Sequence, residues 1–139
     1  MPIMMDAEAL AVFMKDVFKQ VADDFGIDHV SETDLTTRLL VDNRHLRPGG
    51  TVSGPSIFAL ADVSAYLMTL ARIGPKALAV TTNCSIDFMR KPEAGVDLIA
   101  KTRLLKLGKL LSVCDVLVYS EGKEQPVARA SLTYAIPPK

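Results

Sequence analysis

The fold of this chain is decided by residues 48–74, which read PGGTVSGPSIFALADVSAYLMTLARIG. A glycine-rich turn opens this stretch, and the apolar run that follows has only Asp62 and the phenol of Tyr66 as ionisable groups until its last turn. Ser53 is a favourable N-cap, and Pro55 suits a first helical turn, where its missing N–H is not needed. The pattern predicts a long helix that is apolar on nearly every face and must be surrounded by other elements.

The segments on either side of this helix predict a further helix and five strands. Apolar residues at three- and four-residue intervals indicate an additional, amphipathic N-terminal helix over residues 6–25, and DLTTRLLV at 34–41 indicates a first strand. Two-residue alternation then predicts four strands joined as an antiparallel meander, at residues 80–89, 97–107, 110–119 and 126–136. The expected fold class is α+β, with one antiparallel sheet wrapped around a long central helix. A single domain over residues 1–139 is expected, with its core at 34–136.

Composition narrows the possible functions. Sixteen basic and sixteen acidic residues balance, so no net charge directs the chain toward nucleic acid or an anionic membrane. The central apolar run is shorter than the ~20 residues that span a bilayer and contains a carboxylate, which favours a core helix.

The first residues lack the basic start of a secretory signal, and two cysteines without metal-ligand spacing suit reduced thiols, so a cytoplasmic location is expected. Neither histidine has a partner at ligand spacing, so no metal and no cofactor are expected.

Three motifs resemble those of a known family. They are the stretch from Gly50 to Asp62, in which an acidic residue follows the helix-start glycine by eight positions, TTNCSIDFMRKP at 81–92, and ARASLTY at 128–134. Together they resemble the hotdog-fold acyl-CoA thioesterases, most closely the phenylacetic-acid-degradation type, over about residues 35–136. The resemblance implies a hotdog fold and the hydrolysis of a thioester to a carboxylic acid and free coenzyme A.

The resemblance also implies roles for the acidic residue and a threonine. Asp62 matches the family's catalytic carboxylate, acting as general base or nucleophile, and Thr81 matches the hydroxyl that orients the carboxylate or the attacking water. A register error of one residue would exchange Thr81 with Thr82, a further candidate substrate contact, because successive strand residues face opposite sides. The alternatives are a structural carboxylate at Asp62, where a charge in an apolar helix needs hydrogen bonds, and an ordinary strand threonine at Thr81.

The start of the central helix is the expected oxyanion site. A helix N-terminus presents unpaired N–H groups and a partial positive charge, and Gly54 has no side chain to block a thioester. Asp62 lies ~12 Å further along the helix axis at 1.5 Å per residue, too far to act on a carbonyl held by Gly54 of the same subunit. The resemblance implies sites at a dimer interface, where Asp62 would act on a thioester held by a second subunit. A homodimer, or a dimer of dimers, is therefore expected of a catalyst.

The remaining candidates surround the helix start. Family members usually have His-Gly-Gly where this chain has Ser53, Gly54 and Pro55, and often an asparagine at the position of Arg47. Ser53 is either a helix cap or a replacement for that histidine, and Pro55 is a further candidate substrate contact. His45 is either a substrate contact or a solvated loop residue. The basic side chains that could contact coenzyme A phosphates are Arg47, Arg90 and Lys91.

Two other functions remain open from the sequence. A non-catalytic acyl-CoA or acyl-chain binding protein would share the fold, and the departures from the family pattern favour it. A hotdog dehydratase or hydratase would need a histidine paired with the carboxylate, for which His45 is the candidate. The chain has no Gly-x-Ser-x-Gly motif, which disfavours a Ser-His-Asp hydrolase.

Overall fold

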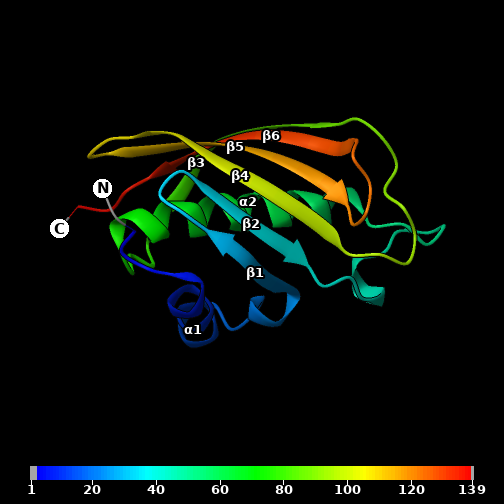
Figure 1. Cartoon of the computed structure of the whole chain (residues 1–139), viewed down its shortest axis with the longest axis horizontal. Helices are drawn as coiled ribbons and strands as arrows, with labels where there is room; N and C mark the ends of the chain where they lie inside the picture. The colour runs from blue at the N-terminus through cyan, green and yellow to red at the C-terminus, as the bar shows by residue number, and fades with distance from the viewer. Residues whose placement is uncertain (1–2, 139) are drawn as a thin grey trace.

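The computed structural model describes residues 3–138, in which six antiparallel strands form one sheet that curves around a long helix (Figure 1). The helices are α1 (Ala7–Val17) and α2 (Gly54–Ile73), with short 3₁₀ turns at Ala22–Asp24 and Asn43–His45. The strands are β1 (Phe25–Val30), β2 (Asp34–Leu39), β3 (Val80–Phe88), β4 (Leu98–Leu107), β5 (Leu111–Ser120) and β6 (Pro126–Ala135). This is the hotdog fold, and it confirms the expected sheet around a central helix with an additional N-terminal helix.

The central helix α2 forms where the sequence predicts it. The Ser53 hydroxyl accepts a hydrogen bond from the Ser56 N–H at 3.4 Å, and Gly74, at φ 94°, ends the helix in a backbone conformation that favours glycine. The helix contacts all six strands and α1. Its length and hydropathy would suit a membrane span, but 67% of its most apolar window is buried in the fold, as in the core helix of a globular domain.

Buried hydroxyl pairs fix the position of α2 on the sheet. Thr37 of β2 and Ser64 of α2 share a hydrogen bond of 2.6 Å, and Thr69 of α2 donates to Ser112 of β5 at 2.8 Å. All four side chains are buried, and a buried hydroxyl that loses its partner costs ~1–3 kcal/mol. These pairs therefore favour one placement of the helix over a slide along the sheet.

The prediction for the N-terminal segment was wrong in its extent. The helix expected over residues 6–25 ends at Val17, and Phe25–Val30 form β1, which periodicity did not predict. Phe18 leaves the helical conformation (φ −127°, ψ 50°), and the chain then turns so that β1 pairs antiparallel with β2. Strand pairing satisfies backbone groups that a frayed helix end would leave open, so tertiary pairing outweighed the local helical pattern.

The strand order β1-β2-β4-β5-β6-β3 also corrects the expected four-strand meander. The strands β4, β5 and β6 do follow one another as a meander, but β3 pairs with β6 and not with β4. The segment between β3 and β4 therefore crosses to the other side of the meander. Among residues 3–138, β3 has a strand partner on one side only, and this free edge lies beside α2.

Candidate active site

The carboxylate of Asp62 is held by two hydroxyl groups. Thr81 Oγ1 donates to Asp62 Oδ1 at 2.6 Å, and the Tyr134 hydroxyl donates to the same oxygen at 2.8 Å. None of the ion pairs within residues 3–138 includes Asp62. The carboxylate is half-buried, and its hydrogen-bond donors are neutral hydroxyl groups and not a cation.

A bulge in β3 decides which threonine reaches the carboxylate. Thr81 pairs with Tyr134 of β6, but the next pair is Asn83 with Thr133, so Thr82 is the extra residue. Thr82 is exposed and its hydroxyl lies 3.3 Å from the Thr133 carbonyl. The bulge puts Thr81 on the helix side of the sheet, as such irregularities re-aim side chains. Of the two threonines, the structure brings Thr81 and not Thr82 to Asp62.

An apolar cavity of ≈ 410 Å³ lies against this carboxylate. Its lining comes from the end of α1, from α2 and from the strands beside them, and its aromatic members are Phe18, Tyr66 and Tyr134. The Phe18 and Tyr66 rings meet edge to face with their centroids 6.0 Å apart. We name this cavity the Asp62 pocket. It could hold an apolar group next to a carboxylate.

Tyr134 was not among the residues that sequence reasoning assigned to the site. Strand alternation could have found it, because Tyr134 lies in the motif ARASLTY and faces inward with Leu132 and Ala130. Burial, and next the Asp62 carboxylate, raise the pKa of the Tyr134 phenol. The phenol is therefore protonated at neutral pH and acts as a hydrogen-bond donor.

A free N–H group lies at the start of α2. Pro55 has no N–H, the Ser56 N–H binds the Ser53 hydroxyl, and the Ile57 N–H binds the Ser53 carbonyl at 3.0 Å. Within residues 3–138, no acceptor binds the N–H of Gly54. A β-carbon at Gly54 would meet the Phe88 ring at 3.6 Å, an ordinary van der Waals contact, so the start of α2 lies beside the end of β3.

Gly54 lines a second cavity of ≈ 400 Å³, which we name the helix-start pocket. Three basic residues that the sequence singled out line it as well: Arg47, Arg90 and Lys91. The Arg90 side chain already donates two hydrogen bonds within the fold, to the Pro126 carbonyl at 3.0 Å and to the Gln125 side chain at 2.9 Å. The pocket thus joins backbone and cationic donors that suit an anionic ligand.

Within one subunit the two pockets are separate. They share no lining residue, and Asp62 lines one while Gly54 lines the other. Asp62 follows Gly54 by eight positions, which correspond to ~12 Å of helix at 1.5 Å per residue. One subunit therefore does not bring its own carboxylate and its own helix start to a common atom.

The remaining candidates have structural positions. His45 is buried, so its description as a solvated loop residue was wrong. Its Nδ1 accepts from the Asp42 N–H at 2.9 Å and its Nε2 lies 3.4 Å from Asp24, so it lines neither pocket. Ser53 is the helix cap, and Pro55 is exposed in the first turn of α2. No group of three metal-ligating side chains occurs among the residues that the structure describes.

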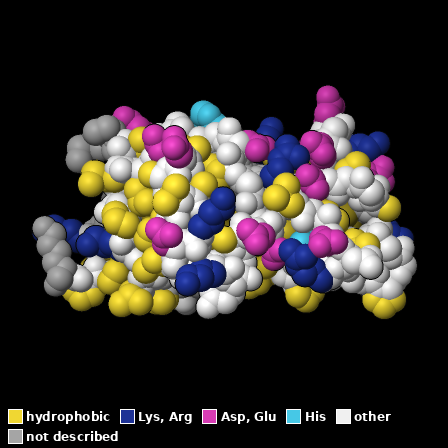
Figure 2. Space-filling model, turned by 90° about the horizontal axis from the view of Figure 1, so that it is seen from below, with side chains coloured by type: hydrophobic (Ala, Val, Ile, Leu, Met, Phe, Trp, Pro, Cys, Tyr) yellow, Lys and Arg dark blue, Asp and Glu magenta, His cyan; other side chains and the backbone are white. Residues whose placement is uncertain are grey.

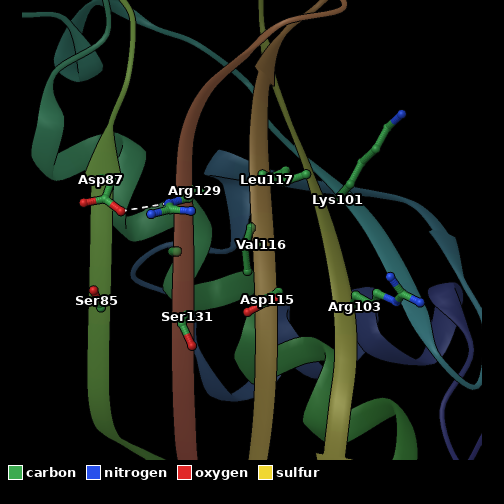
Figure 3. Close-up of a pocket in the computed structure, with 10 residues that line it drawn as sticks. Ser85, Asp87, Lys101, Arg103, Asp115, Val116, Leu117, Arg129 and Ser131 are labelled. Carbon is green, nitrogen blue, oxygen red and sulfur yellow. Dashed lines mark hydrogen bonds and ion pairs between the residues drawn. The ribbon is translucent and has the colours of Figure 1, made fainter.

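A third cavity, on the outer face of the sheet, has a different character (Figure 3). Its charged residues lie on neighbouring strands: Asp87, Arg129, Asp115, Lys101 and Arg103. Asp87 and Arg129 form an exposed ion pair of 2.8 Å, and acidic and basic groups alternate across the strands. The face drawn in Figure 2 likewise intersperses lysine and arginine with aspartate and glutamate. Neighbouring opposite charges leave this cavity without a field of one sign, and exposed ion pairs of this kind contribute little to stability.

Comparison with known proteins gives the family. Residues 49–127 match the family model of the thioesterase superfamily. A Pseudomonas aeruginosa protein provisionally named an esterase, PA0474, is 32% identical over 108 residues, covering 77% of this chain and 78% of that protein. The crystal structure of a protein from Silicibacter sp. TM1040, provisionally named a thioesterase, is 57% identical with a TM-score of 0.92, covering 98% of this chain and 94% of that one.

A more distant structure bears on the subtype. It is a mutant of the phenylacetic acid degradation protein PaaI from Thermus thermophilus, 27% identical with a TM-score of 0.71, covering 91% of this chain and 99% of that one.

The chain belongs to the thioesterase superfamily. It is a thioester hydrolase with a hotdog fold, and the expected resemblance to the phenylacetic-acid-degradation type is confirmed.

Proposed function

We propose that this protein is an acyl-CoA thioesterase in which Asp62 of one subunit and the Gly54 N–H of a second subunit act on the same thioester. The observation that carries the proposal is the location of these two groups at opposite ends of β3. Thr81, near the start of the strand, binds Asp62, and Phe88, at its end, lies beside Gly54. The two half-sites are thus linked by one strand whose outer edge has no partner in residues 3–138.

Pairing of β3 with β3 of a second copy would complete the site. Two antiparallel strands related by a two-fold axis near the strand centre set the start of one strand against the end of the other. The Asp62 pocket of each copy would then adjoin the helix-start pocket of its partner. Exposed apolar side chains at this edge would be covered, namely Val80, Phe88 and Met89.

The chemistry follows from the groups in the two pockets. The Gly54 N–H would donate to the thioester carbonyl oxygen and, with the positive end of α2, stabilise the negative charge that develops there. Asp62 would remove a proton from a water that attacks the carbonyl carbon, or attack that carbon itself. Collapse of the tetrahedral species breaks the carbon–sulfur bond, and the coenzyme A thiolate leaves. In the general-base route Asp62 then gives the proton that it took from water to this thiolate. In the nucleophile route the acyl group stays on Asp62 as an anhydride, which water hydrolyses to the carboxylic acid while the thiolate takes up the proton released from that water.

The other predicted site residues take supporting roles in this proposal. Arg47, Arg90 and Lys91 would contact coenzyme A phosphates, because they line the helix-start pocket. Ser53 would fix the helix start as its cap. His45 lines neither pocket, which leaves a hydratase reaction without its histidine. The acyl-CoA is the substrate, and no resident cofactor takes part in the proposed steps.

We further propose a cytoplasmic homodimer, with a dimer of dimers as the next assembly that the family resemblance implies. Neither nucleic acid nor a membrane is a proposed partner. Both cysteines, Cys84 and Cys114, are free thiols, which suits a reducing compartment. Size-exclusion chromatography with light scattering tests the assembly, since a monomer would contradict the shared site.

Release of free thiol from a panel of acyl-CoA thioesters tests the reaction. The wild type is expected to release coenzyme A from at least one member, and Asp62→Asn to lose that release. Binding of acyl-CoA without turnover would replace the proposal with the non-catalytic binding protein. Water addition to crotonyl-CoA would replace it with the hydratase.

Mixing two inactive variants tests whether the site is shared. Gly54→Pro removes the proposed oxyanion donor, and Asp62→Asn removes the carboxylate. A mixed dimer would contain one site with both changes and one intact site. Random reassembly of equal amounts should therefore restore about a quarter of the wild-type activity. Mixing without unfolding the dimers is the control, and no recovery after reassembly would contradict the shared site.

A further inference from the structure

We propose that Tyr134 is a positioning residue that, together with Thr81, holds Asp62 Oδ1 and thereby turns Oδ2 toward the substrate. The inference rests on the proposed function, because it concerns which oxygen of the proposed base or nucleophile reacts. It adds a residue to which neither the sequence nor the resemblance gave a role.

Both hydroxyl donors converge on one carboxylate oxygen. Thr81 Oγ1 lies 2.6 Å and the Tyr134 hydroxyl 2.8 Å from Asp62 Oδ1. Among the residues that the structure describes, no donor binds Asp62 Oδ2. A rotation of the carboxylate that exchanged its oxygens would break both bonds unless the donors followed. The two hydroxyls therefore give the oxygens different roles, one bound and one open.

The backbone, the ring and the hydroxyl of Tyr134 are all held in place by neighbouring residues. Its backbone pairs with β5 at Ser112 and with β3 at Thr81, so the phenol and the Thr81 hydroxyl approach Asp62 from adjacent strands. Its ring is buried and packs against the Tyr66 ring with their centroids 5.9 Å apart. Its single hydroxyl proton is shared between the Asp62 carboxylate and the Asp62 backbone carbonyl, which lies 3.0 Å from the hydroxyl oxygen. Because the phenol contacts both the carboxylate and the backbone of the same residue, it fixes the side chain relative to the helix.

The neighbouring tyrosine does not compete for this role. The Tyr66 hydroxyl donates to the Ala77 carbonyl at 3.0 Å, and its ring lies between those of Phe18 and Tyr134. Burial raises the pKa of Tyr134 and keeps its proton available for donation. The Asp62 pocket thus has one tyrosine that supplies a ring surface and one that supplies a hydrogen bond.

Tyr134→Phe tests this role, because it keeps the buried ring and removes only the hydroxyl. A hydrogen bond to a charged group suggests that kcat for the best thioester falls ~10- to 100-fold. The KM should change less than about threefold, because the hydroxyl orients the carboxylate and does not bind the substrate. An unchanged kcat would overturn the proposal, and so would a loss confined to KM, which would make Tyr134 a substrate contact.

Three further variants separate positioning from folding. Tyr119→Phe is the matched control, since Tyr119 lies on β5 beside Lys101, outside both pockets, and should keep wild-type kcat. Thr81→Val should resemble Tyr134→Phe, whereas Thr81→Ser should retain activity. The combined Thr81→Val and Tyr134→Phe variant should lose less than the product of the single losses, because both hydroxyls hold one oxygen.

The crystal structure of the combined variant gives a readout that needs no turnover. The Asp62 side chain is expected to leave its single orientation, and an unmoved carboxylate would overturn the proposal. A wild type without activity toward any acyl-CoA would contradict the proposed function, while this structural comparison would still decide the role of Tyr134.

Discussion

Two half-buried carboxylates, Asp62 and Asp97, have different hydrogen-bond partners in this fold. Both oxygens of Asp97 are bound, since one accepts from Arg38 at 3.1 Å and the other from the Val41 N–H at 3.0 Å. Asp62 has both of its hydroxyl donors on one oxygen, and no ion pair within residues 3–138 includes it. A carboxylate that pairs with a cation and has both oxygens hydrogen-bonded stabilises the fold. One with neutral donors and an open oxygen is suited to chemistry.

The surroundings of Asp97 support this contrast. Arg38 of β2 also binds Asp28 of β1 at 3.2 Å and Glu121, after β5, at 3.1 Å. The hydrogen bonds that Arg38 donates to Asp28 and then to Glu121 raise the pKa of Arg38, so the guanidinium stays charged. This cluster ties together segments that are far apart in the sequence. Nothing comparable surrounds Asp62 within residues 3–138, where it lies beside a cavity and the free edge of the sheet.

The largest expected effect is the loss of activity in Asp62→Asn. The amide keeps the size of the side chain but cannot accept a proton, so kcat should fall by ~10³-fold. The free energy of unfolding should change by less than about 1 kcal/mol, because the amide oxygen can still accept hydrogen bonds from the Thr81 and Tyr134 hydroxyls. Coenzyme A release and urea denaturation measure the two effects. The matched control is Asp87→Asn in the exposed ion pair with Arg129, which should keep both properties.

The opposite result is expected for Asp97→Ala. The change leaves the Val41 N–H and part of Arg38 without their partner, so the protein should lose ~1–3 kcal/mol of unfolding free energy. The kcat of the folded protein should stay within about twofold of the wild type, since Asp97 lines neither pocket. A large loss of kcat with unchanged stability would break the distinction between the two carboxylates.

The smallest expected effect is a stability change in acid that depends on Asp24. Burial raises the pKa of this carboxyl. The interactions with Arg44 and His45 together lower the pKa by more than burial raises it, so the folded value lies below the ordinary 3.8. A lowered pKa stabilises the fold above the ordinary value, and the contribution is lost as the pH falls through the folded value. Unfolding free energies of wild type and Asp24→Asn should therefore differ most above about pH 4 and converge in stronger acid. A difference that is constant with pH would contradict this assignment.

Much of the fold follows from local patterns in the sequence. The cap at Ser53 and the Gly-Pro stop bound α2, and alternation located β2, β4, β5 and β6. The strand β1 escaped prediction because the predicted helix ended at residue 25 and no element was predicted over residues 26–33, and only its pairing with β2 makes it a strand. The position of β3 beside β6 was also missed, because alternation says that a segment is a strand and not which neighbour it pairs with.

The candidate site divides in the same way. Asp62 was found because a charge in an apolar helix is costly, and Gly54 because a helix start offers N–H donors. The resemblance named Thr81, and the bulge, which shifts the strand register by one residue after Thr81, is the physical reason that Thr81 and not Thr82 reaches Asp62. Alternation could place Tyr134 on the inner face of β6, but its contact with Asp62, 72 positions away in the sequence, depends on the pairing of β6 with β3.

The sequence by itself determined that a long apolar helix carries one carboxylate eight residues after a glycine that starts it. Helix caps, composition and periodicity act over a few residues, so they can be read without knowing how the chain folds back on itself. Only the tertiary structure decided which hydroxyls hold that carboxylate, and that Asp62 and Gly54 of one chain belong to separate pockets. Those features depend on strand order and on a bulge, which arise from backbone pairing between segments far apart in the sequence.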